Sequence, residues 1–249
     1  MIPLVRSELL KIRTTRGWYA YLAVIVLLVG IAVAADIGDS SNVVRGLSEF
    51  QVGLVDSAGI AALLAVVLGI TMVTTEFRHG TITPTLLAEP RREAVLAAKA
   101  VAESIVAVFF ALLALFVVAG VASIWLSIVD ADIHLGNADV AKRAAQAILL
   151  CVLWGLTGVA IGSVVHSQVA ALVGTLVWVF LGEHLVAALF GVIDFDGAVS
   201  YLPFRALDSA DGTNEADMLS YWPGVAVSLA WIALIGAAGI ERTSRRDIS

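Results

Sequence analysis

Long runs of apolar residues alternate with short polar segments along this chain. Six of these runs reach the minimum of about 17 residues that a helix needs to cross a bilayer. We expect membrane-spanning helices at 18–35, 57–75, 104–129, 144–165, 169–190 and 223–240. The runs lack the strict apolar–polar alternation of a membrane β-barrel, and helices satisfy every backbone hydrogen bond in lipid. The pattern predicts an all-α integral membrane protein with six transmembrane helices in one domain over residues 1–249.

Residues 1–17 precede the first run and have a different pattern. Apolar residues recur every three or four positions, with basic residues between them. The apolar positions are Ile2, Val5, Leu9 and Ile12, and the basic ones are Arg6, Lys11, Arg13 and Arg16. This spacing predicts an amphipathic helix in the membrane interface, with a simple basic flank as the alternative. A cleaved signal peptide is a further alternative, although the run at 18–35 exceeds the usual core of about 7 to 15 residues.

Composition supports a membrane protein. Hydrophobic residues make up 60% of the chain and charged residues 14%, and the mean hydropathy is +0.96. A soluble domain is about half apolar and about a quarter charged. We expect the lipid bilayer as a partner, and no nucleic acid. Cys151 is the only cysteine, which excludes an intrachain disulfide and a cysteine-rich metal site, and we expect no metal.

The basic residues indicate the orientation in the membrane. With both termini inside, 11 of the 15 Lys and Arg residues lie on the cytoplasmic side. The remaining four, in the outer loops, are Arg45, Lys142, Arg143 and Arg205. Because positive charge is retained inside, we expect both termini to be cytoplasmic. The acidic segment 191–222 would then lie outside, where its aromatic residues favour folding back onto the membrane.

The segment 76–99 is the longest strongly charged stretch between two apolar runs on the predicted inner side. Gly80 allows a turn, and Pro84 and Pro90 each suit the first turn of a helix. Within this segment we expect the helix of the second span to end, a short helix to follow between two turns, and the helix leading into the third span to begin. Apolar residues within the segment favour a protein partner over an ordinary solvated loop. They are Phe77, Ile82, Leu86 and Leu87.

Small residues recur at four-residue spacing in two of the predicted helices. Ala61, Ala65 and Gly69 share one face of the second span, and Gly158 and Gly162 share one face of the fourth. Small residues at this spacing allow helices to approach closely in a membrane.

Charged residues also occur within or next to the apolar runs. Arg92, Lys99 and Glu103 share one face of the helix leading into the third span, and that face must contact water or protein. Glu183 and His184 lie within the fifth run, where a charge at mid-bilayer costs about 2.5 to 3.5 kcal/mol. Two explanations are open for Glu183. It lines an export path or attracts a cationic solute, or the fifth helix is broken there and the carboxylate faces an outer vestibule.

The chain lacks the sequence signatures of a self-sufficient enzyme. A phosphate-binding loop of the Walker kind needs a Gly-Lys pair, but the three lysines follow other residues. These lysines are Lys11, Lys99 and Lys142, which follow Leu10, Ala98 and Ala141. The four histidines do not form a His-Glu-x-x-His zinc motif, and Gly-x-Ser-x-Gly is absent. We therefore expect no catalytic residue and no cofactor on this chain.

The charged segment resembles a known family. The string Thr75-Glu76-Phe77-Arg78-His79-Gly80-Thr81, followed by Pro90-Arg91-Arg92 and Ala98-Lys99, is similar to the inner loop of permease subunits of type-2 ATP-binding-cassette (ABC) exporters, particularly the small bacterial ones. The lead from Ser7 to Arg16 resembles their interfacial helix, and Tyr201-Leu202-Pro203 resembles their outer segment before the last span. The six-span plan covers essentially the whole chain.

The resemblance implies a complex of two permease chains, identical or paralogous, with two copies of a separate ATPase that binds ATP and Mg. The segment that couples to the ATPase would comprise Glu76, Phe77, Arg78, His79, Gly80, Thr81, Leu86, Leu87, Arg91 and Arg92. Spans two and five would line the substrate path with Thr71, Thr74, Thr175, Trp178 and Glu183.

The implied function is outward movement of a small hydrophobic or amphipathic substrate (a drug, antibiotic or lipid) by alternating access, in a bacterial inner membrane. Two alternatives are a non-transporting subunit that transmits ATPase motion to a partner, and a six-span intramembrane enzyme.

Overall fold

The computed structural model describes residues 1–15, 17–193, 196–212 and 218–244. Of the described residues, 86% are helical, and none forms a β-strand. Six helical segments are long and apolar enough to cross a membrane. They are Gly17–Asp39, Ser48–Arg78, Arg92–Ile128, Ala138–Val164, Gln168–Val192 and Tyr221–Arg242. The predicted all-α fold with six candidate membrane spans is confirmed. The interfacial position of the first helix and the cytoplasmic side of the termini stay predictions.

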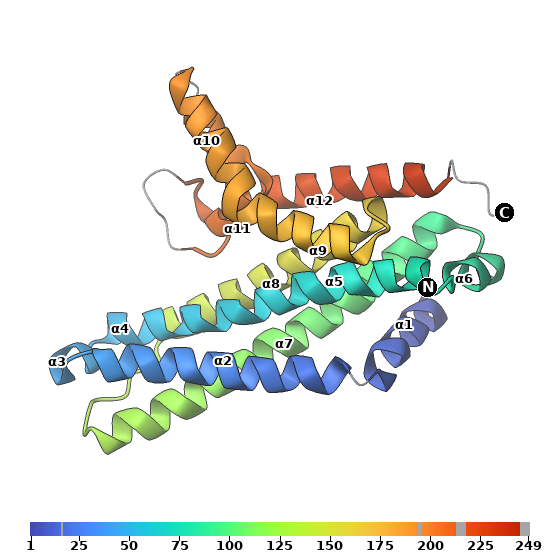
Figure 1. Cartoon of the computed structure of the whole chain (residues 1–249). Helices are drawn as coiled ribbons and strands as arrows, with labels where there is room; N and C mark the ends of the chain where they lie inside the picture. The colour runs from blue at the N-terminus through green and yellow to red at the C-terminus, as the bar shows by residue number, and fades with distance from the viewer. Residues whose placement is uncertain (16, 194–195, 213–217, 245–249) are drawn as a thin grey trace.

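Figure 1 shows how these elements follow one another. The α-helices are α1 (Ile2–Thr14), α2 (Gly17–Asp39), α3 (Asn42–Arg45), α4 (Ser48–Gly53), α5 (Ile60–Arg78), α6 (Ile82–Ala88), α7 (Arg92–Ile128), α8 (Ala138–Val164), α9 (Gln168–Val177), α10 (Glu183–Val192), α11 (Pro203–Ser209) and α12 (Tyr221–Ser244). Three further helical segments are η1 (Leu54–Gly59) and η3 (Asp196–Tyr201), both 3-10 helices, and the π-helical turn η2 (Trp178–Gly182).

Helices α5 and α8 form the central pair of the bundle. A Cβ placed on Gly69 of α5 would collide with the Gly155 carbonyl of α8, and one placed on Gly158 would collide with the Val66 carbonyl of α5. At Gly162, a Cβ would lie 3.1 Å from the Ile70 carbonyl oxygen. The two backbones therefore touch through glycines, in the close contact that the small-residue spacing predicted.

Helices α2 and α7 pack beside this pair, and α1 lies against α7. The face of α2 that is buried in the bundle consists of Ile25, Val29, Val33 and Ile37, which are spaced by one turn. Trp18 at the start of α2 stacks on Phe109 and Phe110 of α7, with both ring centroids 5.6 Å away. These contacts close the apolar core on that side.

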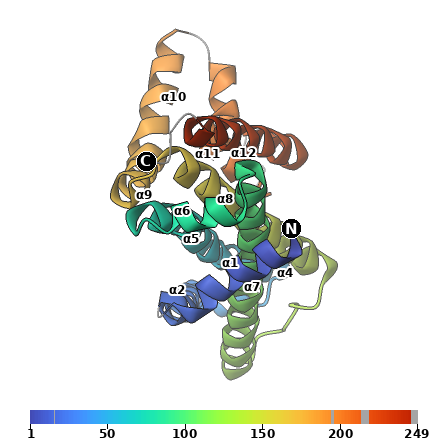
Figure 2. The same ribbon diagram turned by 90° about the vertical axis from the view of Figure 1, so that its right-hand side faces the viewer.

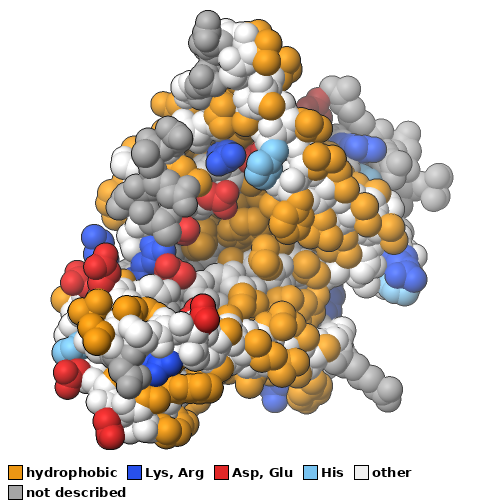
Figure 3. Space-filling view, turned by 60° about the vertical axis from the view of Figure 1, so that its left-hand side comes forward, with side chains coloured by type: hydrophobic (Ala, Val, Ile, Leu, Met, Phe, Trp, Pro, Cys, Tyr) orange, Lys and Arg blue, Asp and Glu red, His pale blue; other side chains and the backbone are white. Residues whose placement is uncertain are grey.

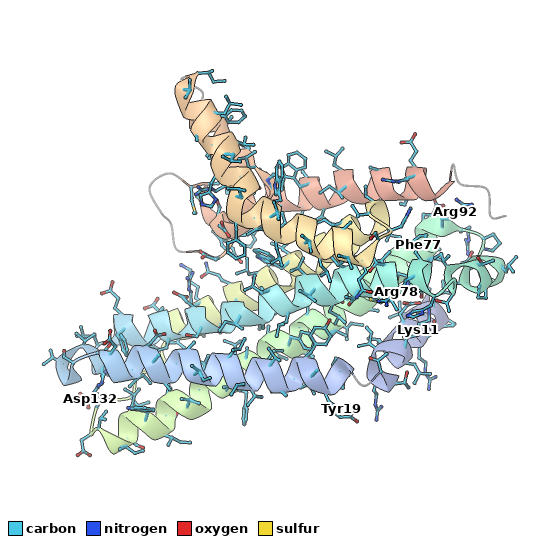
Figure 4. All side chains as sticks on the ribbon, viewed as in Figure 1. Lys11, Tyr19, Phe77, Arg78, Arg92 and Asp132 are labelled. Atoms are coloured by element: carbon cyan, nitrogen blue, oxygen red, sulfur yellow. The ribbon has the colours of Figure 1, made fainter. Side chains whose placement is uncertain are left out.

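A buried glutamine joins two loops at the end of the bundle opposite the termini. Gln51 of α4 is 0% exposed, and its amide nitrogen donates to the carbonyls of Arg45 and Asp132. Its amide oxygen accepts the His134 N–H at 2.7 Å. Figure 4 places Asp132 at this end, where the loop after α7 returns toward α4. One side chain thus connects the loop before α4 to the loop after α7.

The fifth span is bent. After η2, α10 leaves the line of α9 and projects from the bundle (Figures 1 and 2). The chain returns through η3 to α11, which packs against α12 and α8 and buries Phe204, Ala206 and Leu207. The described part of segment 191–222 thus folds back onto the helices of the chain itself.

The fourth helix begins at Ala138, earlier than the predicted start at 144. The first turns of this helix are polar, so the hydropathy pattern did not include them in the span. Contacts with other parts of the chain stabilise them. Arg143 donates to the Asp56 carboxylate at 2.5 Å, and the Asn137 amide donates to Ser48.

Apolar side chains cover the outside of the bundle as well as its core. Figure 3 shows large areas of hydrophobic side chains on the visible face, interrupted by charged groups. Phe116 is 76% exposed and Ile128 is 74% exposed. An apolar surface of this extent fits a lipid environment, where such residues need no further burial.

We expect Gly158→Ala to destabilise the protein by about 1 to 3 kcal/mol, because the new methyl group would collide with the α5 backbone. Gly120→Ala on α7 is the matched control, because a Cβ there has no atom within 4 Å. The control should be neutral or slightly stabilising, since alanine favours a helix by up to about 1 kcal/mol over glycine. Thermal unfolding in detergent measures both, and equal Tm values for the two variants would contradict the close α5–α8 contact.

Candidate functional site

Residues 78–91 join α5 to α7 at one end of the bundle, and we call them the knuckle. The chain leaves α5 at Arg78, Gly80 adopts a φ of +68°, and α6 follows. Glycine suits this left-handed conformation because it has no Cβ. Pro84 lies in the first turn of α6 as expected, whereas Pro90 precedes α7 and lies outside its first turn.

Most of the residues that the sequence assigned to a partner are exposed in the knuckle. They are Arg78, His79, Gly80, Thr81, Leu87 and Arg91. Leu87 is 77% exposed, which leaves a large apolar side chain uncovered at the tip. The side chain of Leu86 lies outside the described part of the structure. The exposed set offers basic and apolar groups for contact with another protein.

Contacts at both ends of the knuckle hold it in place. The ring of Phe77 lies 3.9 Å from the ring of His166, centroid to centroid, and Arg78 donates to the Gln168 side chain at 3.4 Å. At the other end, Arg91 donates to Glu89 at 3.0 Å. The hydrogen bonds from Arg91 lower the pKa of the Glu89 carboxyl, so this surface pair stays charged at neutral pH.

Four charged side chains meet beneath the knuckle, and we call Glu8, Lys11, Glu76 and Lys99 the charge quartet. Lys11 Nζ donates to Glu8 at 2.6 Å and to Glu76 at 2.7 Å. Lys99 Nζ donates to Glu8 at 2.7 Å and lies 2.8 Å from Glu76 Oε1. The quartet thereby joins α1, α5 and α7. Figure 4 shows Lys11 of α1 beside the end of α5 that bears Phe77 and Arg78.

Three members of the quartet are buried, Lys11 is about half exposed, and the two lysines match the two glutamates in formal charge. Lys99 is 2% exposed, Glu8 4% and Glu76 6%. Removing such ions from water costs several kcal/mol each, and only close opposite charges offset this. At Lys11, burial alone would lower the pKa, but its hydrogen bonds to Glu76 and Glu8 raise the pKa above the ordinary value. The four groups therefore stabilise the fold only as a complete set.

One predicted coupling residue needs correction, and a second is only partly accessible. Glu76 is not exposed for contact with another protein, because its carboxylate is buried and paired with Lys11 and Lys99. Arg92 is half-buried, and its Nη1 has no hydrogen-bond partner among the described residues. Of the two possibilities for the charged face of α7, contact with protein is observed, since Lys99 and Glu103 are both buried.

Glu183 holds the bent fifth span to α11. Its carboxylate is 3% exposed and accepts the N–H groups of Phe204 at 2.8 Å and Arg205 at 2.9 Å, both in the first turn of α11. The Trp178 indole N–H also donates to it at 3.3 Å. Gly182 in η2 makes room for the Trp178 ring, because a Cβ there would lie 2.7 Å from it. The span is helical throughout Gln168–Val192 and bends at the π-helical turn next to Glu183, so it is not broken as the sequence alternative expected, and the carboxylate caps α11.

An apolar groove of about 270 Å³ lies among α8, α9, α11 and α12. Two predicted path residues, Thr175 and Trp178, line it together with Phe204 and Trp231. The Thr175 hydroxyl donates to the Ala171 carbonyl of its own helix, which leaves the wall chiefly apolar. This groove can hold a hydrophobic group of modest size.

The other predicted path residues lie elsewhere. Thr74 is 0% exposed and donates to the Ile70 carbonyl, and Thr71 donates to the Leu68 carbonyl. Neither lines the groove. Their hydroxyls are satisfied within α5, so the structure does not gather the path residues of the second and fifth spans into one site.

Sequence reasoning missed the parts played by Glu8 and Lys11. The sequence pattern places Lys11 among the basic residues of an amphipathic helix and Glu8 in the same segment, and it predicts no partner for either. Only the return of α1 onto α7 brings Glu8 next to Lys99.

No protein-family model matches this chain, and no curated protein matches it significantly.

We expect Lys99→Met to destabilise the protein by about 3 to 5 kcal/mol, because it leaves Glu8 and Glu76 buried with only Lys11. Lys142→Met makes the same chemical change at an exposed position and should change stability by less than about 1 kcal/mol. Thermal or denaturant unfolding distinguishes the two. Similar losses for both variants would contradict a structural role for the quartet.

We expect Glu183→Ala to destabilise the protein by about 1 to 2 kcal/mol, because the first turn of α11 loses its cap. Glu183→Gln keeps an acceptor oxygen and should lose less stability. Hydrogen exchange of the Phe204 and Arg205 amides provides a local readout, and both should exchange faster in the Ala variant. Unchanged exchange at these amides would show that the cap does not form.

Proposed function

We propose that this chain is the permease subunit of a type-2 ABC exporter, and that it moves a hydrophobic or amphipathic molecule outward with energy from a separate ATPase. One observation carries the proposal. The exposed knuckle joins two long helices, and the buried charge quartet fixes both helices to each other at the base of the knuckle. A force applied to α6 would therefore move α5 and α7 together.

The packing supports a route from the knuckle to the groove. Helix α5 touches α8 through Gly69 and Gly158, so a shift of α5 displaces the α8 backbone directly. Helix α8 contributes one wall of the apolar groove. ATP binding by a partner would bias the groove between inward and outward access by favouring one arrangement of these helices.

The groove favours the apolar part of an amphipathic drug, antibiotic or lipid. Its volume of about 270 Å³ is just below the usual range of small-molecule sites, about 300 to 1,000 Å³, so part of a larger ligand would extend beyond it. Trp178 offers a flat aromatic wall, and Thr175 offers a hydroxyl oxygen that can still accept a hydrogen bond. Glu183 does not line this groove, and its carboxylate accepts three N–H groups of the protein.

We place the chain in a bacterial inner membrane with both termini cytoplasmic, so that the knuckle faces the ATPase. Two ATPase subunits would carry ATP and Mg, and a second permease chain, identical or paralogous, would complete the complex. The uncovered apolar surface of α9 and α10 provides an area for that second chain or for lipid. It includes Val169, Val173, Leu185, Leu189 and Val192.

Leu87→Ser tests the proposal. Leu234→Ser on α12 is the matched control, because Leu234 is 61% exposed and lies outside the knuckle. The chain is co-expressed with candidate ABC ATPases from the same cell, and ATPase affinity and ATP-driven uptake of an amphipathic dye are measured in inside-out vesicles. Leu87→Ser should weaken ATPase binding about tenfold, equal to about 1.4 kcal/mol, and reduce uptake, while the control should do neither. An ATPase that binds both variants equally would contradict docking at the knuckle.

A further inference from the structure

Glu103 of α7 is a buried carboxylate that the proposed transport mechanism does not use. Its side chain is 0% exposed, and neither carboxylate oxygen has a hydrogen-bond partner in the described part of the chain. It lies one helical turn from Lys99, but the Lys99 ammonium is bound by Glu8 and Glu76. Glu103 therefore takes no part in the ion pairs of the quartet.

The space around Glu103 is shaped by a glycine of the facing helix. A Cβ on Gly155 of α8 would lie 2.8 Å from Glu103 Oε1 and 3.1 Å from its Cγ. The carboxyl group therefore lies directly against the α8 backbone, in space that any larger residue would fill.

The groups that face Glu103 provide no positive charge. Among the described titratable side chains, Tyr21 of α2 and Cys151 of α8 interact electrostatically with Glu103. Thr71 of α5 shares a hydrogen bond with Tyr21 and carries no charge. The charged groups that α1 and α5 bring near this part of α7 are Glu8, Lys11 and Glu76, which belong to the quartet.

These surroundings determine whether the Glu103 carboxylate is charged, protonated or bound to a metal ion. A charged carboxylate here would be removed from water without a counter-charge or a donor, whereas the neutral acid form is far less costly to bury. A metal ion such as Ca²⁺ needs about six to eight oxygen ligands. No group of three His, Cys, Asp or Glu residues that could hold a metal exists among the residues the structure describes.

We propose that Glu103 is a proton-binding site inside the bundle. The side chain holds a proton while α2, α7 and α8 are packed together, and it releases the proton only when this packing opens and water reaches the carboxylate. Proton binding and the separation of these helices are then linked. This proposal does not depend on the transport function.

Infrared spectroscopy of the protein in lipid nanodiscs at neutral pH tests the proposal directly. The wild-type protein should show the carbonyl band of a protonated carboxylic acid, and Glu103→Gln should lack it. Glu93→Gln is the matched control, because Glu93 is an exposed acid on the same helix, and it should retain the band. On transfer to D₂O, the band should shift slowly, since exchange requires the helices to open.

Thermal unfolding provides a second readout with a defined sign. An unfolded glutamic acid releases its proton near pH 4.3, about the value of an exposed side chain, while folded Glu103 retains it. Because the folded state then binds more protons than the unfolded state, wild-type Tm should fall as pH rises from about 5 to about 8. Glu103→Gln should remove this component of the slope and change Tm at low pH by less than about 4 °C.

Three results would overturn the proposal. One is the absence at neutral pH of an acid carbonyl band that depends on Glu103. Another is a band or Tm that responds to Na⁺ or K⁺ in the wild type but not in Glu103→Gln, which would make the occupant a cation. The third is failure of Glu103→Gln to fold while Glu93→Gln folds, because glutamine has the shape of the neutral acid.

Discussion

A cluster of four charged side chains, three of them buried, constrains the end of this bundle that bears the knuckle. Glu8, Lys11, Glu76 and Lys99 come from three helices, and loss of Lys99 would leave two buried carboxylates with only the half-exposed Lys11. The cost of an unpaired buried ion is several kcal/mol, which exceeds what most single contacts supply. The position of α1 and the spacing between α5 and α7 therefore follow from one electrostatic requirement.

A second constraint acts along the centre of the molecule. Glycines on α5 and α8 allow their backbones to touch, so neither helix can move sideways without displacing the other. Between lipid-exposed helices there is little hydrophobic driving force, and close van der Waals packing supplies the attraction instead. The quartet joins α5 to α7 at the base of the knuckle, and the glycine contact joins α5 to α8, which lines part of the apolar groove.

The region from α9 to α11 follows a different principle. Here a π-turn bends the span, and a carboxylate satisfies the backbone donors at the start of α11. Irregular backbone is tolerated within an apolar environment only where protein groups satisfy it. The Glu183 carboxylate thus satisfies backbone groups at the bend, whereas Glu103 is a buried acid for which the described residues supply no donor.

The sequence by itself determined the fold class, the approximate positions of six spans, the small-residue faces of α5 and α8 and the turn at Gly80. Each depends on local hydropathy, residue size or a single backbone conformation, all of which can be read without knowing the neighbours. Only the tertiary structure decided that Glu76 faces inward, that Glu183 caps α11, that Gln51 joins two loops and that α8 begins at Ala138. Those outcomes depend on which charged or polar group lies opposite another across helices distant in the chain. A sequence states that a buried charge needs a partner, but only the packing of the helices selects that partner.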